Sequence, residues 1–424
     1  MTNFKKQIFS VVAAGSLLVS VASPVLADTT IQISGNGAGS DNYTTVNQTN
    51  TNTVSQNNTA NVTNNVTSNA DTGNNNAGFN TGGDVQIGTG KATTVANVTN
   101  TLNSNAAQIA GCNCEGDTDV KISGNGAKSD NTVTLKDTNV NSIGQNNVAN
   151  VTNNVENKAN SGGNDANSNT GGDVMINTQG ATAVSNVTTV ANANSAMIGG
   201  GVGAGHNSAS FVISGNGAGS DNWIDAKLAN TNTVGQTNSA NVTNNVESKA
   251  KTGYNDAGFN TGGEVMIGTG AAWSEANVDN MVNFNSANLD CGCVTDVLAK
   301  IDGNGASPEH HNYWDFWNKN DNTILLDLVN ANNVGQGNGS NLTNNVEATA
   351  KTGGNDADLN TGDVEYGSDP AINTGAATDV TDVSNSGNVN TVGGAPFVIP
   401  MPGNSSVSVS FNFQALMAFF GMSI

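Results

Sequence analysis

Short runs in which apolar and polar residues alternate recur along the chain and predict β-strands. The stretches 84–87, 173–176 and 264–267 each follow a Gly-Gly pair and alternate polar with apolar residues. That is the period of a strand with one buried face. Val, Ile and Thr favour strands, whereas Asn and Gly disfavour helix interiors. Apart from the last ten residues, no stretch after Val21 keeps apolar residues at helical spacing, so we expect an all-β protein.

The same pattern is repeated four times. The marker Ser-Gly-Asn-Gly-Ala begins at Ser34, Ser123 and Ser214, and its variant Asp-Gly-Asn-Gly-Ala begins at Asp302. The Asn-Gly pair inside each marker is a strong turn signal, because both residues tolerate positive φ. The repeats divide the chain into units of about 89 residues, spanning 31–119, 120–210, 211–298 and 299–395.

Two architectures fit such units. The first is a β-solenoid, a rod in which Val and Ile stack inward and Asn and Thr form ladders on faces and corners. We expect each unit to wind as several coils of about 20 residues, giving a rod on the order of 90 Å long. The alternative is a string of tandem β-sandwich domains. We favour the solenoid, because units one and two contain almost no large aromatic residues for a sandwich core.

Both ends of the chain differ from the repeats. Residues 1–27 have the form of a signal peptide, with Lys5 and Lys6 before an apolar run and small residues before Asp28. We therefore expect a secreted or cell-surface protein, with no transmembrane helix in the mature chain. Residues 396–424 form an apolar C-terminal segment, in which residues 407–413 alternate like a strand. This segment is predicted to be either a cap over the last strand edge or an attachment segment.

The spacing Gln-x-Asn-x-Ala-x-Val, seen in Gln56-Asn57-Asn58-Thr59-Ala60-Asn61-Val62, recurs from Gln145 and Gln236, and unit four has the variant Gln-x-Asn-x-Ser-x-Leu from Gln336. Over these residues the chain resembles the repeats of curlin-type amyloid fibre subunits. The chain as a whole resembles the uncharacterised Asn/Gly-rich secreted repeat proteins of bacteria. That resemblance implies a surface location and no assigned activity.

Charge and composition narrow the choice of function. The chain carries 34 acidic residues against 13 Lys, with no Arg, and its formal net charge is −21. Nucleic acid is an improbable partner, because its phosphates are held largely by Lys and Arg. The acids lie at repeat spacing instead of clustering, so we expect no enzyme and assign no catalytic residue. Repeated Asp/Asn/Gly corners leave calcium open as a cofactor, although solvated acidic turns explain them better.

Four cysteines form two Cys-x-Cys pairs, which are Cys112 with Cys114 and Cys291 with Cys293. In an oxidising environment each pair can form a local disulfide. Cross-links between neighbouring molecules and a metal site remain alternatives. In a rod of many short coils the two pairs would lie roughly 40 Å apart, too far for a shared bridge.

Unit four contains an insertion at residues 308–319 that gathers aromatic and histidine side chains. Its candidate ligand-binding residues are His310, His311, Tyr313, Trp314 and Trp317. Exposed aromatic rings suit a glycan or a protein partner. The insertion fits a hydrophobic lid over the end of the solenoid equally well, and metal capture by the two histidines is a further alternative.

These observations predict a secreted structural repeat protein that acts as a filament, a surface-layer component or an adhesin stalk. Its expected partners are other copies of itself or the cell-surface matrix. The alternative is a carbohydrate- or calcium-dependent adhesive module that binds through the insertion in unit four.

Overall fold

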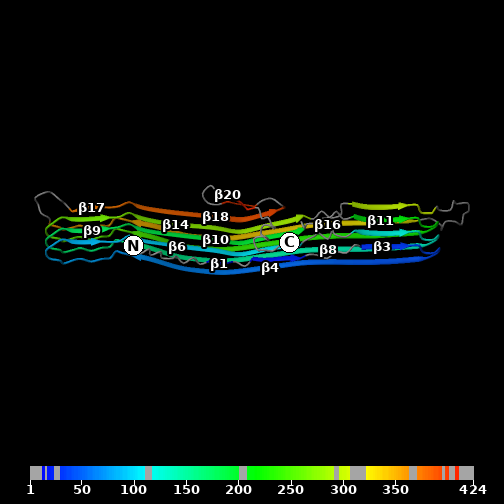
Figure 1. Ribbon diagram of the computed structural model, residues 1–424, viewed down its shortest axis with the longest axis horizontal. Coiled ribbons are helices and arrows are strands. Elements are labelled where there is room, and N and C mark those ends of the chain that lie inside the picture. The colour runs from blue at the N-terminus through cyan, green and yellow to red at the C-terminus, as the bar shows by residue number, and fades with distance from the viewer. Residues whose placement is uncertain are drawn as a thin grey trace, which may run out of the picture.

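The fold is a flattened β-solenoid of four stacked coils, shown in Figure 1. The computed structural model describes residues 12–14, 17–22, 29–109, 117–199, 208–290, 296–305, 321–361, 370–393, 397–400 and 406–409. Every pairing between coils is parallel. The solenoid predicted from the repeats is therefore confirmed, and the tandem sandwiches are excluded.

One face of the solenoid is a long sheet with strand order β16-β12-β8-β4. Its strands are β4 (Asp41–Asp71), β8 (Asp130–Asn160), β12 (Asp221–Lys251) and β16 (Asn322–Lys351). Three of them contain 31 residues and β16 contains 30. At about 3.3 Å per residue, each spans roughly 100 Å. The long axis in Figure 1 is thus the strand direction, not the stacking direction.

Three smaller sheets contain the rest of each coil. The opposing sheet covers the long sheet with β6 (Ala92–Ile109), β10 (Ala181–Gly199), β14 (Ala272–Asp290) and β18 (Ala377–Val392). Towards one end lie β3 (Thr29–Ser34), β7 (Thr118–Ser123), β11 (Ser208–Ser214) and β15 (Asp296–Asp302). Towards the other end lie β5 (Val85–Gly88), β9 (Val174–Thr178), β13 (Val265–Thr269) and β17 (Ala371–Asn373). We call one coil, with one strand from each sheet, a rung, and number the rungs one to four from the N-terminus.

Each repeat unit therefore forms a single rung, and the expectation of several short coils per unit was wrong. Asn36, Asn125, Asn216 and Asn304 do lie at corners, after Gly residues with positive φ such as Gly35 at 71°. The other Asn residues were expected to form ladders on the faces and corners of short coils. Most of them lie inside long strands, where an identical Asn one rung away satisfies the side-chain amide.

The core consists of apolar columns that run from rung to rung. Near one end, Ile33, Ile122 and Ile213 stack and pack against Val133 and Ile224 of the long sheet. Near the middle, Val and Ala columns of the opposing sheet pack on Val and Ala columns of the long sheet. The large aromatic Phe211 is fully buried in the first of these clusters. Small aliphatic side chains suit the narrow space between two closely stacked sheets.

Two terminal segments add short strands. In the predicted signal peptide, β1 (Val12–Ala14) and β2 (Leu17–Ala22) pair parallel with β6, at the outer edge of rung one. Near the C-terminus, β19 (Phe397–Pro400) and β20 (Ser406–Val409) form an antiparallel pair. The alternation predicted over 407–413 is thus strand as far as Val409, and the rest of that segment lies outside the described residues.

Candidate functional site

The most unusual feature of the interior is a set of buried amide ladders. On the long sheet, Asn64 donates its side-chain N–H to Asn153 (2.7 Å), Asn153 donates to Asn244 (2.7 Å), and Asn244 donates to Asn344 (2.7 Å). Asn153 and Asn244 are fully buried. A buried amide without partners would be costly, so each Asn in the column depends on the same residue in the next rung.

The ladders of the two facing sheets are also joined across the interior. Asn105 of the opposing sheet donates to Asn147 of the long sheet (2.9 Å) and to Asn194 in its own ladder (3.0 Å). Gln145 donates to Gln56 (2.7 Å) and to the backbone carbonyl of Ser195 across the interior (2.9 Å). These bonds form a two-dimensional network that ties every rung to its neighbour and one sheet to the other.

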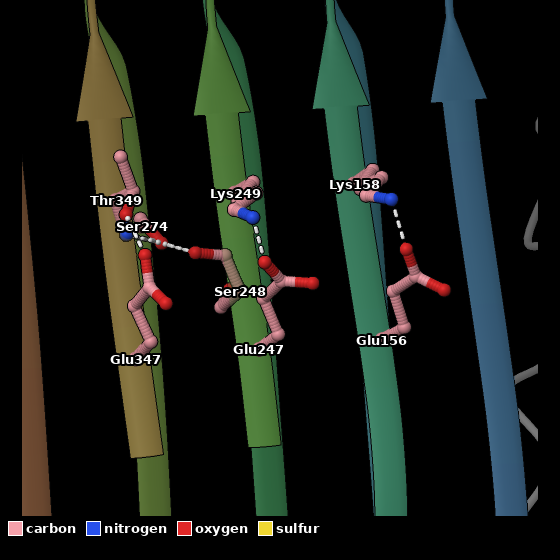
Figure 2. A network of polar contacts seen from close by, with 8 residues as sticks. All are labelled: Glu156, Lys158, Glu247, Ser248, Lys249, Ser274, Glu347 and Thr349. Atoms are coloured by element: carbon pink, nitrogen blue, oxygen red, sulfur yellow. Dashed lines mark hydrogen bonds and ion pairs between the residues drawn. The ribbon is translucent and has the colours of Figure 1, made fainter. Parts of the chain in front are cut away.

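The outer face of the long sheet carries a charged band. In rungs two and three Glu156 pairs with Lys158, and Glu247 pairs with Lys249. Figure 2 shows these ion pairs side by side, with Glu347 accepting a hydrogen bond from Thr349 in rung four. The charge and hydrogen bond of Lys158 lower the pKa of Glu156, the hydrogen bond having the larger effect. A groove crosses all four strands at this band, lined by Asn65, Val66 and Thr67 and the equivalent residues of the other rungs, which include Glu156, Glu247 and Glu347.

Rung four exposes apolar side chains at positions where the other rungs bury theirs. The column of Ile33, Ile122 and Ile213 continues to Ile301 in rung four, whose side chain is 46% exposed against 0% for Ile213. Ile372 continues the column of Ile267 and is 45% exposed. Ten of the large exposed apolar residues lie in rung four: Val297, Leu298, Ile301, Leu325, Leu328, Val329, Leu359, Ile372, Val383 and Val392. Among the described residues, no further rung follows rung four, and its edge is apolar rather than polar.

Two carboxyl groups are held in partly apolar surroundings. Burial raises the pKa of Asp137. Its side chain lies in an inward-facing column, between Gln48 of rung one and Leu228 of rung three. Burial is also the main cause of the raised pKa of Asp279, with the charge of Asp382 acting in the same direction and a hydrogen bond from Ser384 opposing it. One buried carboxylate oxygen of Asp279 has no hydrogen-bond partner in the described part of the chain.

Replacing Asp137 by Asn should raise the melting temperature at pH 7. An acid with a raised folded-state pKa favours folding only while protonated, so its contribution is present at low pH and is lost as pH rises through that pKa. The difference between Asp137→Asn and the parent should therefore vanish below about pH 3, and thermal melts followed by circular dichroism across pH 3–8 measure it. If Asp137→Asn raised the melting temperature by the same amount at every pH, burial of the charged carboxylate would not be the cause of the increase.

The residues proposed from sequence for ligand binding, His310, His311, Tyr313, Trp314 and Trp317, lie outside the described residues, and so do the four cysteines. The structure does correct the argument that separated the two cysteine pairs. The segment that contains the first cysteine pair follows Ile109, the last residue of β6, and the segment that contains the second follows Asp290, the last residue of β14. Strand β10 lies between β6 and β14 and pairs with both. These entry points are two strand spacings apart, about 10 Å rather than 40 Å, because each unit adds only one rung.

The acidic residues at one described corner stack in a column. Asp41, Asp130 and Asp221 stack in register at one corner, and Asp321 donates its backbone N–H to Asp221 there (3.0 Å). Within the described ranges, no group of three or more His, Cys, Asp or Glu residues is arranged to hold a metal ion. Across the same ranges there is no helix with the length and apolar character needed to span a membrane.

Comparisons with protein-family models, with curated proteins and with solved structures found no match.

The sequence predicted Asn ladders on the faces and corners and a cap over the last strand edge, but it did not predict that the ladders would be buried inside the solenoid. The sequence does contain a signal for the buried ladders. Gln56, Asn58, Ala60 and Val62 are each two residues apart, so they lie on the same face of a strand. That face was expected to be apolar, and the polar residues were assigned to outer faces and corners. Which strands lie at the two edges depends on how many rungs the chain makes. That number is known only when each repeat unit is known to form one coil.

Proposed function

We propose that this protein is a secreted structural protein whose rigid, flat solenoid serves as a scaffold outside the cell. The observation that carries the proposal is the continuous network of in-register amide ladders, which uses interior side chains to lock rung to rung. Such a network stiffens the whole plate and leaves few polar groups free for a ligand. The apparent signal peptide supports the extracellular location.

The surface chemistry is compatible with this role. Over residues 49–65 and the equivalent positions of the other long strands, the outward-facing residues are uncharged and no larger than Val or Asn. Ion pairs are placed beyond this region, in the band that contains Glu156 and Glu247. A smooth, neutral face about 60 Å long suits a spacer or layer component better than a pocket-based receptor.

The test separates the scaffold from the adhesive alternative. The exported protein is compared with a variant lacking residues 308–319 and with one in which Tyr313, Trp314 and Trp317 are Ser. A scaffold should appear by electron microscopy as plates roughly 100 Å long in all three samples. All three should also resist protease equally and bind no glycan on an array.

Glycan binding that is lost in both variants would favour the adhesive module instead. Calcium dependence is checked by melting the exported protein with and without a chelator, and the scaffold predicts no difference. A chelator-induced drop in melting temperature would show that the acidic corners hold calcium, contrary to the proposal.

A further inference from the structure

We propose that the rung-four edge of one copy binds the rung-one edge of another, head to tail, so that copies add into an unbranched filament. The register would be the one that already joins the rungs, with Asn42 of the incoming copy beside Asn322. This inference rests on the proposed scaffold function and names its partner as a second copy of this chain.

The apolar columns give the first reason. In rung four Ile301 and Ile372 extend columns whose inner members, Ile213 and Ile267, are fully buried. In the proposed register the rung-one residues Ile33 and Ile87 would cover them. The contact would therefore repeat packing that the protein already contains between its own rungs.

The direction of the amide ladders gives the second reason. The ladder through Asn42, Asn131, Asn222 and Asn322 donates from each rung to the next, at 2.8, 2.8 and 2.6 Å. The ladder through Asn52 runs the same way and ends on Asn332. Such ladders end on an N–H group in rung four and begin with an oxygen in rung one. In the parallel register, each of these N–H ends on rung four would meet an oxygen end on rung one of the next copy.

The Gln ladder and the outer Asn ladders run in the opposite direction. Gln336 donates to Gln236 (2.7 Å), and Asn345 donates to Asn245 (2.8 Å). The outer Asn ladder ends on the oxygen of Asn345 in rung four and begins with the N–H group of Asn65 in rung one. A head-to-tail joint in the parallel register would continue this ladder as well, and such a joint generates an open filament instead of a closed dimer.

Charge favours the same arrangement. The described part of rung one contains three acids, Asp41, Asp71 and Asp84, whereas that of rung four contains nine. A joint between two rung-four edges would place nine acidic residues of one copy against nine of the other. In the head-to-tail register Lys351 would face Asp71, and most rung-four acids would face neutral residues, as Glu347 would face Thr67.

The size of the edge is sufficient for a stable contact. Two sheets about 10 Å apart and roughly 100 Å long present an edge on the order of 1,000–1,500 Å² on each copy. The total area buried would then exceed the roughly 1,600 Å² of a standard interface. The open strands β16 and β18 would also gain the backbone hydrogen bonds that every inner rung makes on both sides.

One column of glycines offers a steric test. An added Cβ on Gly162 would lie 2.1 Å from the carbonyl oxygen of Gly253, and one on Gly253 would lie 2.1 Å from that of Gly353. A Cβ on Gly353 meets nothing within 4 Å, because no rung follows. In a filament the next rung would be the partner copy, and its Gly73 carbonyl would occupy the clashing position.

The opposite edge has an equivalent position. At the corner that contains Gly37 and Gly126, an added Cβ points towards the preceding rung. A Cβ on Gly126 of rung two would lie 2.3 Å from the backbone nitrogen of Ala38 in rung one. A Cβ on Gly37 meets nothing within 4 Å. Neither Gly37 nor Gly353 has a positive φ. Gly37→Ala and Gly353→Ala should therefore leave the isolated fold intact and each block one edge of the joint.

The experiment measures assembly by sedimentation velocity and electron microscopy, using the chain that begins at Asp28. The parent should form filaments, and Gly37→Ala and Gly353→Ala should each remain monomeric with the parent's circular dichroism spectrum. An equimolar mixture of the two variants should give dimers only, because each retains the edge that the other lacks. One Gly353→Ala copy in ten should shorten parent filaments to about ten copies.

Several results would overturn the inference. It fails if the parent stays monomeric, if both variants assemble like the parent, or if their mixture gives no dimer. A parent that forms rigid, protease-resistant monomeric plates would reject the joint and leave the scaffold function standing. Loss of the scaffold function would show itself separately, as glycan binding that requires residues 308–319.

The N-terminal segment provides a second readout. Strands β1 and β2 occupy the β6 edge at which β18 of a partner copy would pair. The full-length chain should therefore assemble more slowly than the chain that begins at Asp28. Assembly of the full-length chain alone, with none from the shorter chain, would overturn the proposed position of the joint.

Discussion

Gly162→Ala should unfold the stacked turns between rungs two and three, with a loss on the order of 4 kcal/mol or more in the free energy of unfolding. The added methyl carbon would lie 2.1 Å from the Gly253 carbonyl oxygen and 2.5 Å from the Thr252 carbonyl carbon. Both contacts are with backbone, which cannot rotate away as a side chain does. Urea denaturation of dilute, monomeric protein measures the change.

Gly353→Ala is the matched control, because it makes the same substitution in the same column with nothing within 4 Å. Its midpoint in urea should equal that of the parent. If Gly162→Ala and Gly353→Ala proved equally stable, the rungs would not be stacked as closely at this turn as the structure places them.

Asn153→Ala should be the most damaging single change in the polar interior, costing about 3–5 kcal/mol. The side-chain oxygen of Asn153 accepts hydrogen bonds from Asn64 (2.7 Å) and Asn100 (3.1 Å), and its N–H donates to Asn244 (2.7 Å). Truncation removes a partner from three amides, and those of Asn100 and Asn244 are fully buried. Buried amides without partners lose the hydrogen bonds that water supplies in the unfolded chain.

The neighbouring Asn154 provides the control. It belongs to the outer ladder, accepting from Asn245 and donating to Asn65, both at 2.8 Å. Because water can replace those bonds, Asn154→Ala should change stability by less than about 1 kcal/mol. Equal losses for the two variants would mean that the interior ladder contributes no more than the outer one.

Much of the fold was predictable from local patterns. Alternation after Gly-Gly correctly located β5, β9 and β13, and the Asn-Gly markers correctly located four corners. The repeat of Val and Ile at fixed positions correctly indicated a solenoid. These features depend on a few neighbouring residues, because strand periodicity and turn conformation are local properties.

The candidate site was predicted less well. Sequence analysis directed attention to the aromatic insertion and the cysteines, because such residue types carry ligand chemistry. The structure instead draws attention to residues of ordinary chemistry, such as Asn42, Asn153 and Gly353. What they contribute depends on what lies one rung away, and that neighbour is 89 to 100 residues distant in the chain.

The sequence by itself determined that this chain forms β-strands, that its pattern repeats four times, and that small aliphatic residues recur in each repeat. Only the tertiary structure decided that one repeat makes one rung, that Asn faces inward, and that two unlike edges are left open. The physical reason is that an Asn side chain has no fixed preference for the inside of a protein. It is stable there when neighbouring groups satisfy its amide, most often an identical residue one rung away, and such stacking is a property of the assembled rungs.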